Sequence, residues 1–150
     1  MVFCVILEKL IKMGRAYTYR CDHCAYEEQF NEGHGFLIHP RSLDSYIQSG
    51  QKLFHYKIEH VIKQLSEKRS NLFINAGFKI YRCPKCNLLY SKVDAVLHEN
   101  GKIYHKSEFR CNSCGGRLKL TNIHRLKKAV CSKCKKFSFS LDQRKMVLWD

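Results

Sequence analysis

The chain has 150 residues, of which 45% are hydrophobic, and its formal net charge is +14. This length suits one ordinary domain or two very small ones, and the average hydrophobic content predicts a folded chain. No run approaches the roughly 18 apolar residues of a membrane-spanning helix, so we expect no membrane partner. The opening residues lack the basic leader and the small-residue cleavage site of a secretory signal peptide.

The first patterned elements are strands around a cysteine pair. Residues 1–12 are interpreted as an N-terminal extension, because the well-patterned sequence begins at Met13. Alternating apolar and polar side chains at 15–20 predict a strand that leads into Cys21 and Cys24. Residues 25–30 follow the pair and predict its partner strand.

The segment that follows has a helical pattern. Ser42 is a suitable N-cap for a first helix, which we expect to end at Ser49 and Gly50. A second helix over 52–69 has an apolar face made of Phe54, Ile58, Val61, Ile62 and Leu65. We expect this face to pack on the protein's own sheet. If it were exposed, it would instead be a docking surface for a partner.

Strands return in the second half of the chain. Residues 78–82 predict a strand that enters a second cysteine pair at 83–86. The sequence Asn100-Gly101 is the strongest short signal for a β-hairpin, and strand-like segments flank it. After the last cysteine pair we expect two further strands around a turn at 142–144.

Eight of the nine cysteines form four Cys-x-x-Cys pairs. Two intervening residues let one tight turn direct both sulfurs to a single point, and four thiolates satisfy a tetrahedral zinc ion. Disulfide frameworks have irregular spacing, and thioredoxin-type redox sites occur singly in a βαβ context. Iron in a rubredoxin-like site is chemically feasible, but small knuckles of this kind usually hold zinc. We predict two structural Zn²⁺ ions per chain, held by Cys21, Cys24, Cys83, Cys86, Cys111, Cys114, Cys131 and Cys134.

The four pairs can combine in three ways. Sixteen residues separate the last two pairs, which is the interval expected for a Cys4 zinc site and favours sequential pairing. Site 1 would then contain Cys21, Cys24, Cys83 and Cys86, and site 2 would contain Cys111, Cys114, Cys131 and Cys134. Alternatively the two middle pairs join and the outer pairs meet, or the pairs interleave. Proximity of Cys21 to Cys83, rather than to Cys131, distinguishes the schemes.

These patterns predict a small, zinc-stabilised α+β protein. It would contain two zinc ribbons, each built from antiparallel hairpins, with a two-helix insertion in the first. The expected divisions are an extension over 1–12, a first ribbon over 13–108 with its insertion at about 41–69, and a C-terminal ribbon over 109–150. So small a ribbon needs metal to fold, since it buries little apolar surface. Four thiolates close the coordination shell, so we expect a non-enzymatic protein.

The cysteine pairs are approached by a repeated Tyr-Arg-Cys or Phe-Arg-Cys sequence, the patterned region opens with Met-Gly-Arg at 13–15, and the chain closes with Leu-Trp-Asp. In this layout, over residues 13–150, the chain resembles a group of small bacterial zinc-ribbon proteins. The resemblance implies that the eight paired cysteines are the ligands, and it implies no particular activity. Members of the group often have glycine after the second cysteine of a knuckle, where this chain has Ala25, Asn87 and Lys135.

Positive charge is concentrated near the C-terminus. Residues 101–150 hold 13 basic and 3 acidic residues, and this excess favours a polyanionic partner. We therefore expect binding to RNA or single-stranded DNA, with Phe137 or Phe139 stacking on a base unless the ribbon's own core buries them. The expected phosphate contacts are Arg117, Lys119, Arg125, Lys127, Lys128, Lys133, Lys135 and Lys136.

Two other functions compete with nucleic-acid binding. A protein-interaction adaptor would dock a protein partner through the helical insertion. A metal storage or delivery protein would hold labile metal that a mild chelator removes without unfolding. The sequence has no motif that indicates a small-molecule substrate. Reduced thiols available for metal favour a cytoplasmic location.

Overall fold

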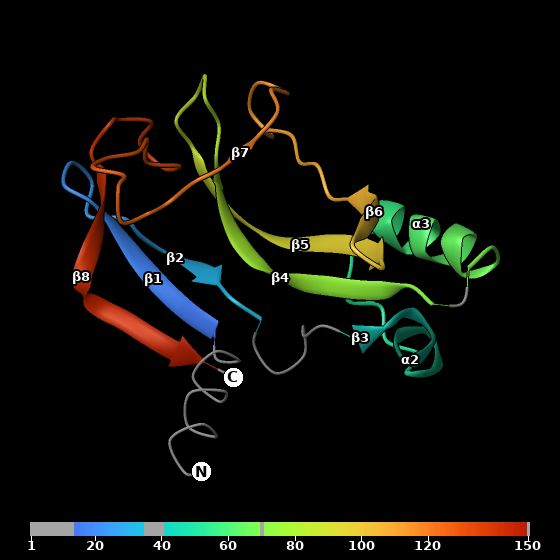
Figure 1. Ribbon diagram of the computed structural model, residues 1–150. Coiled ribbons are helices and arrows are strands. Elements are labelled where there is room, and N and C mark those ends of the chain that lie inside the picture. The colour runs from blue at the N-terminus through green and yellow to red at the C-terminus, as the bar shows by residue number, and fades with distance from the viewer. Residues whose placement is uncertain (1–13, 35–40, 70, 150) are drawn as a thin grey trace, which may run out of the picture.

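The computed structural model describes residues 14–34, 41–69 and 71–149, and Figure 1 shows two antiparallel sheets with two short helices. The first sheet has the order β2-β1-β8, with β1 at Gly14–Cys21, β2 at Glu27–Glu32 and β8 at Phe139–Trp149. The second has the order β3-β4-β5-β6, with β3 at Arg41–Ser42, β4 at Phe73–Arg82, β5 at Leu89–Glu99 and β6 at Lys102–Lys106. The short strand β7, Lys119–Leu120, also pairs with β4. The chain is thus a small α+β protein, and the extension predicted at 1–12 lies outside the described residues.

The first sheet brings the two ends of the described chain together. The strands predicted near 15–20 and 25–30 are confirmed as β1 and β2. The two strands predicted on either side of a turn at 142–144 are instead two parts of one strand, β8, and both parts pair with β1. Residues 142–145 lie between these parts, where the register shifts between Tyr17 and Tyr19. Both parts extend the ladder of β1 and satisfy its backbone groups on either side of the shift.

The second sheet is built on the long β4–β5 hairpin. The predicted turn between β5 and β6 is confirmed, and both of its central residues have positive φ, 48° at Asn100 and 80° at Gly101. Such φ values match the right-handed twist of the flanking strands, which is why Asn-Gly favours this turn. The outer edge of β4 is paired by three short segments in succession: β3, the bridge residue Gly33, and β7.

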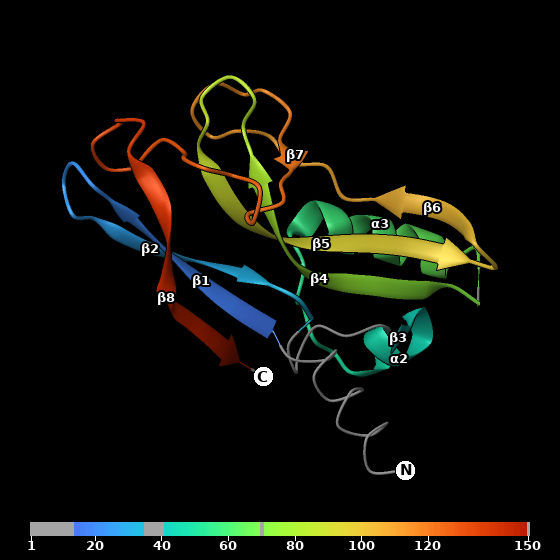
Figure 2. The same ribbon diagram turned by 60° about the vertical axis from the view of Figure 1, so that its left-hand side comes forward.

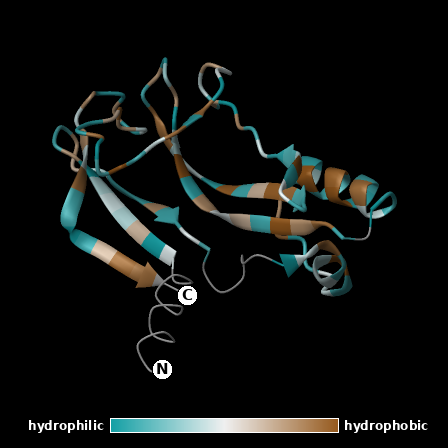
Figure 3. Cartoon of the chain, in the orientation of Figure 1, coloured by the Kyte–Doolittle hydropathy of each residue, from teal (hydrophilic) through white to brown (hydrophobic). Residues whose placement is uncertain are grey.

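Two helices, α2 at Leu43–Gln48 and α3 at Tyr56–Ser66, cover one face of the second sheet. The N-cap prediction is confirmed, since the Ser42 hydroxyl accepts a hydrogen bond of 3.2 Å from the Ser45 amide. The second helix is shorter than predicted at its N-terminus, because His55 caps it. Figure 3 shows apolar residues of α3 above a largely apolar sheet.

The apolar face of α3 packs on the protein's own sheet, as predicted. Ile58 and Ile62 are buried in a core that includes Ile74 and Leu97 of β4 and β5. The remaining stripe residues, Phe54, Val61 and Leu65, are half-buried against the same core. The exposed patch that would have favoured an adaptor docking through this helix is therefore not present on α3.

A second core joins the two sheets. Tyr19 of β1 and Phe139 of β8 have ring centroids 5.5 Å apart, and both pack in a cluster with Ile80 and Leu89 of the second sheet. Strands from both sides of the predicted boundary at 108–109 share the first sheet. The domain boundary at 108–109 stays a prediction. In the structure, residues from both sides of it share one sheet and one hydrophobic core.

Candidate metal centres

Each Cys-x-x-Cys pair lies in a knuckle, defined as the six residues that start at its first cysteine: the first knuckle is 21–26, the second 83–88, the third 111–116 and the fourth 131–136. In every knuckle the amide of the first cysteine donates a hydrogen bond to the carbonyl five residues later. The amide of the residue four positions later donates to the carbonyl of that cysteine. All eight distances are 2.8–3.0 Å. The first cysteine is buried in each knuckle, whereas the second is half-buried or exposed. The four knuckles thus have the same backbone turn although their sequences differ.

The residue after the second cysteine has a left-handed backbone in all four knuckles. The φ angles are 58° at Ala25, 56° at Asn87, 70° at Gly115 and 62° at Lys135. Only Gly115 adopts this region without a steric cost. Ala25, Asn87 and Lys135 stand where members of the resembled group often have glycine. These residues therefore keep the same turn, but their side chains add local strain.

The sheets bring all four knuckles to one end of the molecule, as Figures 1 and 2 show. The first knuckle follows β1 and the fourth precedes β8, and these strands are antiparallel neighbours. The second knuckle is the tip of the β4–β5 hairpin, and the third is followed by β7, which pairs with β4. Strand pairing therefore places the first knuckle beside the fourth and the second knuckle beside the third.

The resulting cysteine groups correct the predicted pairing. The outer group contains Cys21, Cys24, Cys131 and Cys134, and the inner group contains Cys83, Cys86, Cys111 and Cys114, with the four sulfurs of each group within 4.8 Å of one another. Sequential pairing is therefore wrong, and the arrangement in which the outer pairs meet is observed. A short gap gives only a small entropic advantage, because loop-closure cost grows slowly with length. The pairing of β1 with β8 outweighs it.

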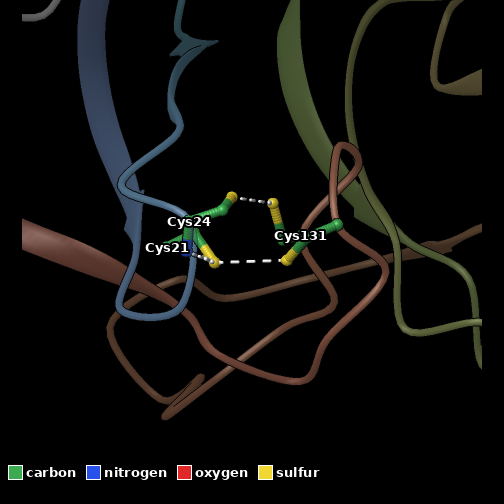
Figure 4. Close-up of side chains that lie close together, drawn as sticks. Cys21, Cys24 and Cys131 are labelled. Carbon is green, nitrogen blue, oxygen red and sulfur yellow. Dashed lines mark hydrogen bonds between the residues drawn. The ribbon is translucent and has the colours of Figure 1, made fainter.

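The sulfur positions fit a tetrahedral metal ion. The sulfurs of Cys21 and Cys134 are 3.5 Å apart, and those of Cys24 and Cys131 are 3.8 Å apart; Figure 4 shows Cys21 and Cys24 pointing toward Cys131. In the inner group, Cys83 and Cys114 are separated by 3.5 Å. Four sulfurs at about 2.3 Å from one ion lie about 3.8 Å from each other, whereas a disulfide joins them at about 2.05 Å. Each group can hold a metal ion.

One thiol of the outer group is held near its ionised form. Burial raises the pKa of Cys21, but hydrogen bonds from the Ser138 hydroxyl, at 3.0 Å, and from backbone amides lower it to about 6. At Cys24, a hydrogen bond from the Tyr26 amide lowers the pKa, while burial and the neighbouring thiols raise it to about 11. One thiolate therefore forms first at neutral pH, and its neighbours lose their protons as a cation binds.

The inner group repeats this arrangement with a different hydroxyl. Burial raises the pKa of Cys111, but the Tyr90 hydroxyl, 3.1 Å away, and two backbone amides lower it to about 6. A hydrogen bond with Cys114, together with burial, raises the pKa of Cys86 to about 12. Each group thus combines one readily ionised thiol with one that ionises only beside a cation.

Two supporting residues, Ser138 and Tyr90, were missed by the sequence reasoning. The hydroxyls of Ser138 and Tyr90 contact sulfurs of knuckles that are distant in the sequence, so no local pattern identifies them. Gly116 lets the chain approach a ligand, since a Cβ there would lie 3.2 Å from the Cys114 sulfur.

The predicted phosphate-contacting residues lie on the chain that runs from the third knuckle to the end of the fourth. All eight, Arg117, Lys119, Arg125, Lys127, Lys128, Lys133, Lys135 and Lys136, are exposed. Arg117 forms an ion pair with Glu108; the other seven form no ion pair with any residue that the structure describes. Phe139 is buried in the core, whereas Phe137 is 57% exposed.

No protein-family model, curated protein or solved structure matches the chain. The resemblance to small bacterial zinc-ribbon proteins therefore stays a prediction, supported in its coarse form by two Cys4 groups. Within the described ranges, none of the helices is both long and apolar enough to span a membrane.

Proposed function

We propose that both cysteine groups bind Zn²⁺ and that these ions are structural. The support is the chemistry of the donor set, four sulfurs at tetrahedral spacing in each group, with buried first cysteines and hydroxyl or amide donors to sulfur. Four protein ligands leave no open position for a substrate or a water, unlike a catalytic zinc. The chain is then a zinc-ribbon protein whose knuckles pair across two sheets.

We further propose that the protein is non-enzymatic and binds single-stranded nucleic acid, either RNA or DNA. The observation that carries this proposal is the series of exposed cations from Lys119 to Lys136, on the chain that leads from the inner cysteine group through the fourth knuckle; these cations have no carboxylate partners among the described residues. Unpaired cations on a rigid surface release counterions from phosphates when a strand binds. The exposed ring of Phe137, at the edge of the fourth knuckle, offers a stacking surface for a base.

The first experiment measures metal content and then binding. Purified protein should contain two equivalents of zinc, and its affinity for mixed-sequence single strands should fall steeply as salt rises. Replacing Lys127 and Lys128 with alanine should weaken binding and reduce the salt slope by about 1.4, because each phosphate contact contributes about 0.7 on single strands. The matched control replaces Lys57 and Lys63, exposed lysines of α3, and should leave the slope unchanged. No binding at low salt would refute the proposal.

Experiments on the same purified protein distinguish the two other functions, metal storage or delivery and a protein-interaction adaptor. Storage or delivery of metal requires an ion that a mild chelator removes while the fold persists, whereas a structural ion leaves only as the fold is lost. An adaptor would capture protein and show no salt-dependent affinity for single strands. Because Ile58 and Ile62 of the α3 stripe are buried, an adaptor would have to dock through other residues of the helical insertion.

A further inference from the structure

A cleft of about 710 Å³ lies between the end of β2, the open face of β4 and β5, and the chain that follows β7. Thr121, Asn122 and His124 form one wall. These residues belong to the segment 121–128, here called the cationic connection, which continues to Arg125, Lys127 and Lys128. The cleft therefore opens directly beside part of the surface proposed to contact phosphates.

The floor of the cleft is the sheet face that the helices leave uncovered. Ile74 and Ala76 pack on the helical side, so strand alternation places Asn75, Gly77 and Lys79 on the opposite face. A Cβ at Gly77 would lie 3.1 Å from Nδ1 of His34 and 3.2 Å from the Gly33 carbonyl oxygen. The absence of a side chain at this position lets the imidazole lie directly on the sheet.

The cleft offers both hydrogen-bond donors and acceptors at fixed positions. The Nδ1–H of His34 donates to the Ala76 carbonyl at 2.5 Å, and Nε2 is the acceptor of the imidazole in this tautomer. On the other wall, the Asn122 side-chain oxygen accepts from the His124 amide at 3.0 Å, which leaves the NH₂ group of Asn122 as a donor. Paired donors and acceptors of this kind recognise the edges of nucleobases.

A charged pair fixes the middle of the floor. Asp94 is 2% exposed, and its carboxylate lies 2.8 Å from Nζ of Lys79 and accepts from the Tyr81 hydroxyl at 3.1 Å. The carboxylate is thus neutralised and does not repel a polyanion. Beyond Lys79 a second hollow of about 340 Å³ continues along the sheet and is lined by Lys106, Arg117 and Lys119. The two hollows share Lys79, Asp94 and Leu120, so together they form a groove rather than an isolated pocket.

We propose that this cleft receives unstacked bases of a bound single strand while the cationic connection contacts the strand's phosphates. This inference rests on the proposed nucleic-acid binding and adds the place where bases, as distinct from phosphates, are recognised. Imidazole rings on both walls provide stacking surfaces, and the amide and imidazole groups contact base edges.

The test compares a mixed-sequence single-stranded DNA with an abasic strand of equal length. Wild-type protein should bind the base-bearing strand at least about tenfold more tightly, since each stacked base contributes appreciably to affinity. Replacing His34 and Asn75 with alanine should lower the affinity for the base-bearing strand about tenfold and leave the abasic affinity and the salt slope unchanged. The matched control replaces His60 and Asn71, exposed residues of the same types outside the cleft, and should change neither affinity.

The outcomes separate this inference from the proposed function. If the cleft variant keeps the full preference for bases, the inference is overturned while salt-dependent binding stands. If wild-type protein binds neither strand, both proposals fail. Because His34 anchors its segment to Ala76, the single variant Asn75→Ala repeats the test with a residue that is exposed. It should lower the affinity for the base-bearing strand alone, and no change would count against the cleft.

Discussion

The sulfur of Cys21 lies 3.5 Å from the sulfur of Cys134, although the two residues are 113 positions apart in the sequence. This contact exists because β1 and β8 are antiparallel neighbours, with Cys21 opposite Phe139 in their register. A metal ion in the outer group would therefore fasten the two ends of the described chain to each other.

Thiol reactivity should report the pairing directly. In a variant with Cys21→Ser and Cys24→Ser, the outer group loses half of its ligands and its metal, so Cys131 and Cys134 should become reactive toward an alkylating reagent. The inner group should stay protected by its own ion. Peptide mass spectrometry identifies the alkylated residues. Reactivity at Cys83 and Cys86 instead would restore the sequential scheme.

Removal of metal should loosen the first sheet most. A structural zinc ion contributes on the order of 10 kcal/mol to folding in small domains, and the outer group fastens β1 to β8. By contrast, the core under α2 and α3 contains no cysteine. Hydrogen exchange of protein treated with chelator and reductant should therefore show loss of protection in β1 and β8 before α3. Uniform loss of protection across both sheets would contradict this order.

Glycine should stabilise two knuckles that now have a strained residue. Ala25→Gly and Lys135→Gly should each raise the free energy of unfolding by about 1 kcal/mol, because both positions have φ near +60°. Gly115→Ala should lower it by a similar amount. Thermal unfolding with excess zinc measures all three. Asn87→Gly is the matched control, and it should have a smaller effect since asparagine tolerates this region better.

Acid should release the metal ions, because protons compete with the metal for the thiolates. In the metal-free protein the pKa of Cys21 and of Cys111 is lowered to about 6 from the ordinary 9.0. Because these pKa values are lowered, the stabilisation that the free thiolates give the fold is present at higher pH and is lost as the pH falls through about 6, and a bound ion moves this loss to lower pH. Zinc release, followed with a chromogenic indicator, should coincide with unfolding.

Two hydroxyl variants should separate the release of the two ions. Ser138→Ala should move release from the outer group to higher pH, and Tyr90→Phe should do the same for the inner group, because each removes a hydrogen bond to a thiolate. The other group's ion serves as the internal control. Equal shifts of both ions in either variant would show that the hydroxyls do not act locally.

The buried carboxylate of Asp94 should be important for stability. Asp94→Ala leaves the Tyr81 hydroxyl buried without its partner and removes the ion pair with Lys79, so it should cost about 2 kcal/mol in urea unfolding. Asp22→Ala, at an exposed position in the first knuckle, should cost less than about 0.5 kcal/mol. A cost at Asp94 no larger than that of the control would mean that the ion pair contributes nothing net.

Local signals were sufficient for much of the secondary structure. The Ser42 cap, the Asn100-Gly101 turn and the apolar stripe of α3 each depend on interactions among residues close in the sequence or on one periodic face. The cysteine pairs likewise form knuckles through bonds within six residues. For that reason the sequence alone predicts the chain's α+β class and its eight candidate ligands.

The tertiary structure decided which knuckles meet, because strand pairing between distant segments determines it. The sixteen-residue interval suggested a local site, yet the chain between Cys114 and Cys131 crosses from the inner group to the outer one, held by bonds such as Val130 N–H to the Asn87 carbonyl, at 3.0 Å. The continuous β8, the hydroxyls that contact sulfur and the cleft over Gly77 likewise depend on contacts between segments far apart in the chain. Spacing alone carries no information about such contacts, since closing a longer loop costs little more than closing a short one.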